Sequence, residues 1–508
     1  MKHLIGVDIG TTGAKSVLVN DRGKVLATEF REYPLSLPKP GWAEQDPEHW
    51  LQATVESLRR LLATAGVSPK SIAGLSFSGQ MHGLVCLDEA DQVLRPAILW
   101  CDTRTTAQCR KIEDAVGGRA RLIQLACNPA LEGFTLPKLV WLQEHEPEVF
   151  ARTRTVLLPK DYVRFRLTGR KSMDMSDAAG SLMLDVRRRR WSKEILSALG
   201  INASLLPPLG ESPEIAGALS REAAALTGLR EGLPIAFGGA DNTCAAVGNG
   251  VIDEGIVAVS IGTSGTVVAP TRTPLLDKQG RAHTFNHSVP GMWYVMGCMM
   301  AAGLSLKWLR DTFGGLERAM AAETGVDAYE FLTAGVGKVP PGAEGLLWLP
   351  YLNGERTPHL DANARGVLFG ISPRHTKAHV VRAILEGVVF GLRDGLEIVR
   401  SLKIPVGEIR LTGGGAKSAV WRQIQADVFG QRCVTINVDE GPAFGAAIIA
   451  GVGTGVFKSF AEACEKSIRV TRTVDPNPQT AAAYEKRYNL FRRLYADLKH
   501  DFAENMKV

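Results

Sequence analysis

The amino-acid sequence predicts an α/β protein with two similar halves, and two observations carry this prediction. Short apolar and alternating segments, typical of strands, take turns along the chain with segments of helical apolar spacing. In addition, a strand–turn–strand segment near the N-terminus recurs close to the middle of the 508 residues. This length leaves room for two to four domains of about 100–200 residues each.

The first predicted element is a β-hairpin. Leu4 to Asp8 is a short apolar run, and Ala14 to Asn20 is a second β-rich run. The glycines and threonines at 10–13 join them as a tight turn. A further turn at 21–23 leads into a third short run at 24–27, so the N-terminus should form an antiparallel meander.

A helix is predicted from Pro47 to Leu62. Asp46 is a residue type preferred at the N-cap, and proline is favoured at the first helical position. A buried strand at 71–77 follows, and it ends at the polar turn 78–83. At the other end of the chain, the spacing over 476–508 predicts an amphipathic helix.

The recurring segment supports an internal duplication. Val7-Asp8-Ile9-Gly10-Thr11-Thr12-Gly13 returns as Val259-Ser260-Ile261-Gly262-Thr263-Ser264-Gly265, an offset of 252 residues. Chance recurrence of a Gly-Thr-rich turn is the alternative, but the match extends into the flanking residues. We therefore expect two halves, residues 1–246 and 247–508, each opening with a strand–turn–strand hairpin.

Composition excludes several classes of protein. The 59 basic and 53 acidic residues give a net charge of +6, too dilute for the basic surface of a nucleic-acid-binding protein. No run of about 18 apolar residues could span a membrane, and the N-terminus lacks the apolar core of a signal peptide. The 8 cysteines are scattered without a C-x-x-C pair, which is typical of a reducing compartment. We expect a cytoplasmic protein without nucleic-acid or membrane partners.

The turn at 10–13 is a candidate phosphate site. Glycines let backbone N–H groups approach a phosphate closely, and the neighbouring Asp8 could hold a divalent cation that bridges phosphates. The alternative is an ordinary tight hairpin. A Walker loop is excluded because neither 10–16 nor 413–418 has glycine directly before its lysine, and no dinucleotide-binding fingerprint is present.

Three further glycine-rich segments are candidates. Gly238-Gly239-Ala240-Asp241-Asn242 places a carboxylate on closely approachable backbone, where a general base could act, although such a segment is also an ordinary turn. Three successive glycines at 413–415 before a helix favour an anionic or flat ligand. The small residues at 441–447 fit either a ligand or close helix packing.

Two other features are interpreted as structural. The four arginines at 187–190 lie in a polar stretch and predict a solvated loop. His283 and His287 are four residues apart, but the zinc-protease pattern with its glutamate is absent.

Longer strings then identify a family resemblance. The chain resembles the FGGY carbohydrate kinases of the actin, Hsp70 and hexokinase-like superfamily. Both signature stretches of that family are readable, at Gly133–Leu142 and from Gly366 to Gly387. Further matching strings, which together cover nearly the whole chain, are 41–47, 79–83, 94–100, 158–162, 174–180 and 349–358. Cys101 and Ala240 depart from the usual pattern beside expected site residues.

The resemblance implies two ribonuclease-H-like lobes with an interdomain cleft, residues 1–246 mainly for the sugar and 247–508 mainly for ATP. It implies that Asp241 is the catalytic base and that Asp8 is catalytic and holds Mg²⁺. The implied substrate-binding residues are Met81, His82, Asp102, Asp241 and Asn242. The implied ATP-binding residues are Gly10, Thr11, Thr12, Gly13, Gly262, Thr263, Ser264, Gly413, Gly414, Gly415 and Lys417.

The activity implied by the resemblance is ATP-dependent phosphorylation of D-xylulose at its 5-hydroxyl. Met81-His82 argues against a glycerol kinase, which usually has Arg-Glu there. L-ribulose, glycerol or another polyol remain alternative substrates, and an actin-like or chaperone-like ATPase is the alternative from another class. Homodimers are common among such enzymes, but the sequence locates no interface.

Overall fold

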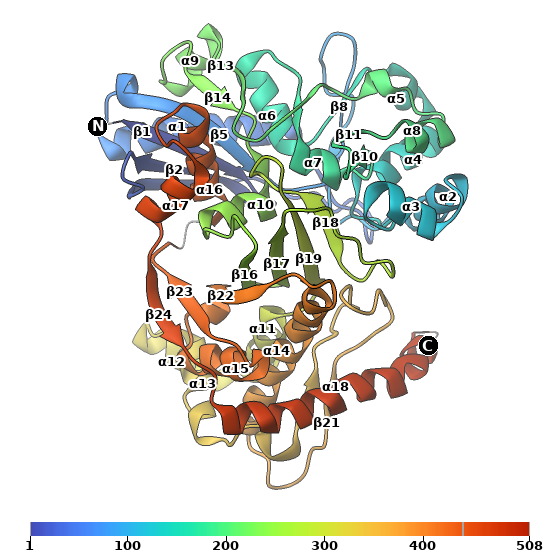
Figure 1. Cartoon of the computed structure of the whole chain (residues 1–508), viewed down its shortest axis with the longest axis vertical. Coiled ribbons are helices and arrows are strands. Elements are labelled where there is room, and N and C mark those ends of the chain that lie inside the picture. Colours follow the sequence, from blue (N-terminus) through green and yellow to red (C-terminus); the bar gives the residue numbers. More distant parts are fainter. Residues whose placement is uncertain (1, 439–440, 507–508) are drawn as a thin grey trace. The chain divides into compact units, whose positions relative to one another are not determined.

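The computed structural model describes residues 2–438 and 441–506, which form two compact units (Figure 1). Unit 1 comprises residues 1–253, 270–294 and 440–469, and unit 2 comprises residues 254–269, 295–439 and 470–508. The units are thus interleaved in the sequence, because unit 1 takes a segment from near the C-terminus. The predicted division between residues 246 and 247 stays a prediction.

Unit 1 is built on a mixed sheet whose strands follow the order β13-β14-β5-β1-β2-β3, with β15 also on β5. The strands are β1 (His3–Ile9), β2 (Gly13–Asn20), β3 (Val25–Glu32), β5 (Ile72–Gly79), β13 (Ile215–Ala218), β14 (Pro234–Ala236) and β15 (Gly239–Ala240). β1 pairs antiparallel with β2 and parallel with β5. The predicted hairpin is therefore confirmed, with Ile9 opposite Ala14 at its closed end.

The helices of unit 1 cover this sheet and extend from it. They are α1 (Pro47–Ala65), α2 (Thr106–Ala115), α3 (Arg119–Ala126), α4 (Thr135–His145), α5 (Pro147–Arg152), α6 (Pro159–Thr168), α7 (Met175–Gly180), α8 (Lys193–Ala198), α9 (Arg221–Thr227), α10 (Asp241–Gly248), α16 (Gly441–Gly453) and α17 (Phe460–Ser467). Short paired strands complete the unit: β4 (Glu44–Gln45) with β7 (Ala97–Ile98), β6 (Val85–Leu87) with β8 (Thr155–Leu157), β9 (Met173–Asp174) with β12 (Leu209–Gly210), and β10 (Leu184–Asp185) with β11 (Arg190–Trp191). Strand β18 (His283–Asn286) also belongs to this unit.

Helix α1 begins as predicted, with the side chain of Asp46 accepting the backbone N–H of Glu48 and Pro47 in the first turn. It ends at Ala65 rather than Leu62, because the left-handed Gly66 (φ 60°) is the residue that closes it. Its buried face, which includes Trp50 and Leu58, packs into a core shared with Phe77 of β5. Strand β5 extends to Gly79, beyond the predicted end at Phe77.

Helix α16 packs directly against β1 and α10, and Figure 1 shows this red helix beside the blue strands. A Cβ on Gly6 would lie 1.9 Å from the carbonyl oxygen of Ala443, and one on Gly445 would lie 1.8 Å from that of Cys244. The small residues at 441–447 thus serve close packing, the structural one of the two interpretations.

Unit 2 repeats the plan. The order β19-β17-β16-β22-β23-β24 runs through the strands β16 (Gly255–Ile261), β17 (Gly265–Thr271), β19 (Trp293–Met299), β22 (Val406–Gly413), β23 (Cys433–Ile436) and β24 (Val470–Val474). β16 pairs antiparallel with β17 and parallel with β22, as β1 does with β2 and β5. Ile261 faces Gly413 as Ile9 faces Gly79, so the duplication predicted from the repeated segment is confirmed in the strand pairing.

The remaining elements of unit 2 are helical apart from one short hairpin. They are β20 (Leu347–Leu349) with β21 (Val367–Phe369), and α11 (Gly303–Phe313), α12 (Gly315–Thr324), α13 (Ala328–Thr333), α14 (Lys377–Ser401), α15 (Ala419–Phe429) and α18 (Pro478–Asn505). Short 3-10 helices lie at 69–71, 203–205, 336–338, 343–345 and 414–416. α18 corresponds to the amphipathic helix predicted over 476–508, whose last two residues lie outside the described residues.

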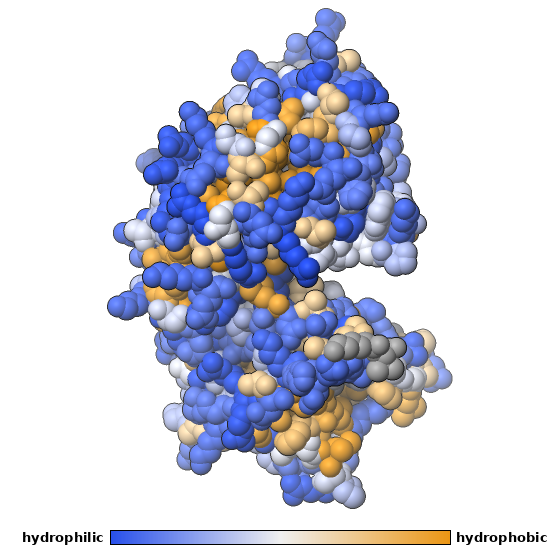
Figure 2. All heavy atoms as spheres, turned by 90° about the vertical axis from the view of Figure 1, so that its right-hand side faces the viewer, coloured by the Kyte–Doolittle hydropathy of each residue, from blue (hydrophilic) through white to orange (hydrophobic). Residues whose placement is uncertain are grey.

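The surface is mainly polar on the face drawn in Figure 2, with scattered apolar patches. Within residues 2–438 and 441–506, no helix is both long and apolar enough to span a membrane. The arginines at 187–190 lie in the turn between β10 and β11 and at the start of β11, and Arg187, Arg188 and Arg190 are exposed as predicted for a solvated loop. Arg189 differs, because its NH2 lies 2.7 Å from Oε2 of Glu211 and its side chain is partly buried. His283 and His287 are buried: their rings bond to Oδ1 of Asn128 and to the carbonyl oxygen of Val251, respectively.

Candidate active site

Two acidic residues singled out from the sequence lie at one edge of the sheet of unit 1. Asp8 is opposite Ser78 near the end of β1, and Asp241 directly follows β15, which pairs with the end of β5. Since β1, β5 and β15 are parallel, their carboxyl ends meet at the same edge. Ligands of open α/β sheets bind at such edges.

The carboxylate of Asp8 is held by β5. Its Oδ1 accepts a hydrogen bond from Oγ of Ser78 at 2.7 Å. Its Oδ2 lies toward the following turn, 3.9 Å from the position that a Cβ on Gly10 would take. Burial raises the pKa of Asp8 against the smaller opposing effects of Ser78 and Lys15, so the charged form gains from a nearby cation.

Asp241 opens helix α10, and its side chain is fixed by the next residue. Its Oδ1 accepts hydrogen bonds from the backbone N (2.7 Å) and from Nδ2 (3.1 Å) of Asn242. Burial, together with the negative charge of Asp8, raises the pKa of Asp241 to about 7. A carboxylate with a pKa near neutrality is a far better proton acceptor than an ordinary aspartate, whose pKa is about 4.

The residues expected to bind sugar gather beside Asp241. Nδ2 of Asn242 lies 3.5 Å from Sδ of Met81, which is buried just beyond the end of β5. Nδ1 of His82 lies 2.5 Å from the carbonyl oxygen of Gly180. Because a carbonyl only accepts, Nδ1 carries the proton, and in the neutral ring Nε2 is the acceptor. The structure thus brings Met81, His82, Asp241 and Asn242 together.

The backbone of His82 is left-handed, with φ 71°, which is uncommon for a residue with a side chain. Its carbonyl oxygen accepts hydrogen bonds from Nζ of Lys138 (2.9 Å) and Oγ1 of Thr135 (3.1 Å). Both donors lie in the first family signature, to which sequence reasoning assigned no individual roles. Lys138 is fully buried, and burial lowers its pKa to about 7.

The turn at Gly10–Gly13 is supported from several sides. Nε2 of Gln80 donates to the carbonyl oxygen of Gly10 at 3.1 Å, and Nε2 of Gln45 donates to that of Thr11 at 2.7 Å. The two glutamines also bond to each other at 3.0 Å. Neither was predicted, although both lie in strings that carried the family resemblance. Their network makes the turn rigid, which a preorganised phosphate site requires.

Asp102 is engaged in a different way. Its Oδ1 and Oδ2 accept from Nε and NH2 of Arg104 at 2.9 and 2.6 Å, and Oδ2 also accepts the backbone N–H of Ala43 at 2.6 Å. The residue is 1 % exposed. The carboxylate of Asp102 thus has a structural role in this ion pair. A role of Asp102 in binding substrate stays a prediction.

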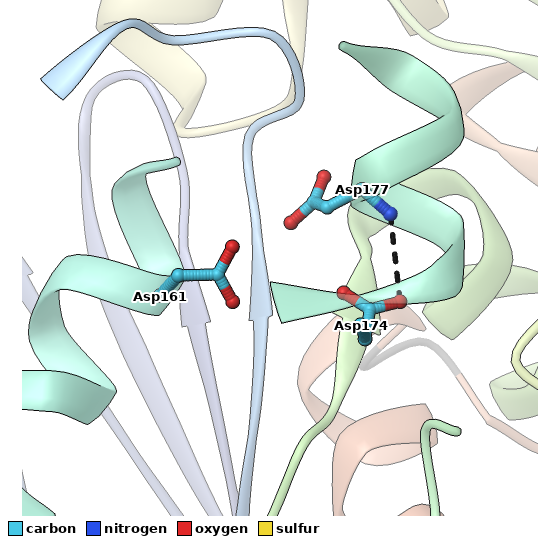
Figure 3. A group of neighbouring side chains, drawn as sticks. All are labelled: Asp161, Asp174 and Asp177. Carbon is cyan, nitrogen blue, oxygen red and sulfur yellow. Dashed lines mark hydrogen bonds between the residues drawn. The ribbon is translucent and has the colours of Figure 1, made fainter. Parts of the chain in front are cut away.

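Asp8 suits Mg²⁺, whereas a buried aspartate cluster nearby does not. Mg²⁺ commonly takes one or two carboxylates together with water and phosphate oxygens, so a single aspartate beside a backbone turn is a fitting donor set. Asp161, Asp174 and Asp177 also converge (Figure 3). However, Nζ of Lys160 already lies 2.6, 2.6 and 3.0 Å from their respective oxygens, so an ammonium fills the position that a metal would need.

In unit 2, most residues expected to bind nucleotide line one pocket of about 510 Å³. These are Gly262, Thr263, Gly414, Gly415 and Lys417. Ser264 lies in the same turn, where its carbonyl oxygen accepts the N–H of Gly262 at 2.9 Å. Gly413 has φ 73°, and a Cβ there would lie 2.5 Å from the carbonyl oxygen of Ile261. The backbone therefore requires glycine at this position whether or not a ligand binds. The volume suits a small organic ligand.

Helix α11 holds the turn of unit 2 in place. The carbonyl oxygen of Gly262 accepts from the N–H of Gly303 at 2.8 Å, and that of Thr263 accepts from Ala302 and Leu304, both at 3.0 Å. The pocket also includes Lys307, Asp327 and Tyr329, which sequence reasoning missed. They lie on α11 and at the start of α13, far in sequence from the glycine turns, and no local pattern marks them.

Comparison with known protein families accounts for both units. The N-terminal domain of the FGGY family of carbohydrate kinases matches residues 3–248, and its C-terminal domain matches residues 257–454. The chain belongs to the FGGY family of carbohydrate kinases.

Individual relatives of this FGGY kinase include two substrate types. It is 44% identical to a xylulose kinase from Bacillus subtilis (strain 168), with 98% of each chain covered. It is 32% identical to a gluconokinase from Bacillus licheniformis, over 99% of this chain and 97% of the relative. A crystal structure of xylulose kinase from Rhodospirillum rubrum superposes with a TM-score of 0.90 at 32% identity, covering 99% of this chain and 100% of the other. The expected two-domain kinase fold is thereby confirmed.

Proposed function

We propose that this FGGY kinase transfers the γ-phosphoryl group of ATP to the 5-hydroxyl of D-xylulose, giving ADP and D-xylulose 5-phosphate. The observation that carries the proposal is the 44% identity to a xylulose kinase over nearly the full length, against 32% to a gluconokinase. The grouping of a near-neutral carboxyl at Asp241 with Met81, His82 and Asn242 supplies the chemistry for a sugar hydroxyl.

Asp241 accepts the proton of the attacking hydroxyl in this proposal. Phosphoryl transfer passes through a loose transition state and needs alignment more than covalent help, so one well-placed base suffices. Asn242 orients the carboxylate through Oδ1, and Nε2 of His82 accepts a hydrogen bond from the sugar. Asp8 would hold Mg²⁺, which when bound neutralises charge on the phosphates. The turns at 10–13 and 262–264 and the glycines at 413–415 would contact ATP.

A substrate panel tests the function. ADP release should be measured with ATP and Mg²⁺ in the presence of D-xylulose, L-ribulose, glycerol or gluconate, and without sugar. We expect kcat/KM to be highest for D-xylulose and ADP release to be low without sugar. Faster turnover of gluconate would identify a gluconokinase, and sugar-independent ATP hydrolysis would identify an actin-like ATPase.

His82→Ala should mainly weaken sugar binding. Removing the ring removes a hydrogen bond to a neutral ligand, which is worth about 1 kcal/mol. The KM for D-xylulose should therefore rise about 5- to 10-fold, while the KM for ATP changes little. Unchanged KM values for all four sugars would contradict the role of His82.

Gly414→Val should weaken ATP binding without preventing folding. The position lines the pocket of unit 2, and a Cβ there would meet nothing closer than 3.8 Å. The added side chain should occupy ligand space and raise the KM for ATP at least about 10-fold, a loss of about 1.4 kcal/mol. Gly315→Val is the matched control, because Gly315 is exposed on α12 with nothing within 4 Å of its Cβ position. An equal KM for ATP in both variants would contradict the proposed nucleotide site.

A further inference from the structure

A fully buried ion cluster lies directly beneath the candidate active site of unit 1. Nζ of Lys160 contacts Asp161, Asp174 and Asp177, and all four side chains are 0 % exposed. NH1 of Arg164 adds a second cation, 3.0 Å from Oδ1 of Asp161. Burying charges is costly, and one ion pair of this kind seldom stabilises a fold. A cluster of five charged side chains therefore calls for an explanation beyond stability.

The cluster contacts the strand that carries the sugar-binding residues. A Cβ on Gly79, the last residue of β5, would lie 2.7 Å from Cβ of Lys160. Gly79 is followed within three residues by Met81 and His82. The side chain of Lys160 therefore packs against the end of β5, at the edge where the site lies.

A hydrogen-bond chain leads from the cluster to the residue before Asp241. Oγ of Ser176 accepts the backbone N–H of Ala240 at 2.9 Å. The same hydroxyl also bonds to Oδ2 of Asp174. Oδ1 of Asp174 in turn forms an ion pair with Nζ of Lys160, at a distance of 2.6 Å.

The direction of this chain is fixed. A backbone N–H can only donate, so Ser176 accepts from Ala240 and must point its single proton at Asp174. Oδ2 of Asp174 accepts hydrogen bonds from the N–H and Oγ–H of Ser176, and Oδ1 forms an ion pair with the ammonium of Lys160. Lys160 thus supplies the opposite charge beside Asp174 in this dry environment, where an unpaired buried charge is costly.

We propose that Ser176, backed by Asp174 and Lys160, is a positioning group that fixes the backbone of Asp241. The proposal rests on the proposed function of Asp241 as the base. The backbone here is tightly packed, because a Cβ on Gly239 would lie 2.3 Å from Oγ of Ser288 and 3.1 Å from Oγ of Ser176. Ala240 and Asp241 are therefore held by the pairing of β15 with β5 on one side and by Ser176 on the other.

The expected consequence of losing the chain is a lower kcat with little change in sugar affinity. We expect Met81 and His82 to remain in place when Ser176 loses its hydroxyl, because other contacts hold them, whereas the carboxylate of Asp241 can drift. A displacement of about 1 Å at a reacting group can cost up to about 10²-fold in rate.

The test compares Ser176→Ala with Ser57→Ala. Ser57 is also a buried serine of unit 1, where its hydroxyl bonds to Oγ of Ser16 and to the carbonyl oxygen of Thr54. Both variants lose one buried hydroxyl. We expect Ser176→Ala to lower kcat for D-xylulose about 10-fold with its KM within about twofold, and Ser57→Ala to keep the kcat of the unmodified protein. Unfolding midpoints should fall similarly in both. Ser176→Cys, which keeps the volume but accepts hydrogen bonds weakly, provides the same comparison if the alanine variant does not fold.

A double-variant cycle with Asp174→Asn tests the chain itself. If Ser176 acts through Asp174, the kcat of the double variant should equal that of the poorer single variant, because the second change breaks a chain already broken. Independent, multiplicative losses, or an equal kcat in Ser176→Ala and Ser57→Ala, would overturn the proposal. Failure of the proposed function is recognised separately, because the unmodified protein would then not phosphorylate D-xylulose.

Discussion

Asp241→Ala should reduce D-xylulose-dependent ADP formation at least about 10²-fold, the lower range for loss of a general base. The carboxylate lies beside Asn242, whose Nδ2 is 3.5 Å from Sδ of Met81, and its pKa of about 7 lets it accept a proton near neutral pH. The side chain accepts its hydrogen bonds from the neighbouring Asn242, a local contact, so the variant should fold.

The pH dependence gives the same prediction a second measurement. Asp241 is active as a base only when ionised, so kcat/KM should rise with pH through about 7 and level off above it. Asp114→Ala, an exposed aspartate on α2, is the control and should retain full activity. Near-normal turnover of Asp241→Ala, with its unfolding midpoint retained, would contradict the prediction that Asp241 is the general base.

Lys160→Met should lower the free energy of unfolding by about 3–5 kcal/mol, the usual cost of removing one partner from a buried ion pair. The substitution keeps an unbranched side chain, one atom shorter, but leaves Asp161, Asp174 and Asp177 facing one another without the central ammonium. Burial and the neighbouring carboxylates already raise the pKa of Asp177 well above its ordinary range, and Lys160 opposes that rise. Chemical denaturation measures the loss.

The loss should grow with pH, and the sign follows from proton binding. Burial already raises the pKa of Asp161 and of Asp177 in the folded protein, and loss of Lys160, which opposes both rises, moves them further above the unfolded value of about 4. The folded variant then binds protons that the unfolded chain releases, so its stability falls as pH rises above 4. Lys466→Met, which removes the exposed partner of Glu462 on α17, should cost less than about 0.5 kcal/mol. Equal losses in the two variants would contradict the account of the cluster.

Much of the site in unit 1 could be predicted because its residues follow strands directly. Asp8, Met81, His82 and Asp241 all lie within a few residues of the ends of β1, β5 and β15, and parallel strands bring their carboxyl ends to one edge. The glycine turns carry a local signal as well. The strand ends and the glycine turns are local in sequence, whereas Met81 and His82 were assigned through the family resemblance of the string 79–83.

The supporting residues could not be predicted in the same way. Lys160 lies 81 residues before Asp241, and Ser176 meets Ala240 across 64 positions. Both lie in strings that carried the family resemblance, 158–162 and 174–180, but nothing local in those strings places Lys160 beside Asp174 or Ser176 beside Ala240. Asp161 lies on α6, Asp174 on β9 and Asp177 on α7, and only tertiary packing brings these three carboxylates together (Figure 3) around Nζ of Lys160.

The sequence by itself determined the duplicated hairpins, the family and the catalytic candidates, because a 252-residue repeat and contiguous strings need no tertiary information. The tertiary structure alone decided which parts of the chain build each unit. Helix α16 belongs with the N-terminal strands because Gly6, Gly248 and Gly445 leave no side-chain volume in the way of its backbone. The contrast between Asp8 and Ser260, at equivalent places in β1 and β16, is visible in the sequence. The structure adds that Asp8 is buried and bonded to Ser78. Burial disfavours the charged carboxylate, and a bound cation would stabilise it.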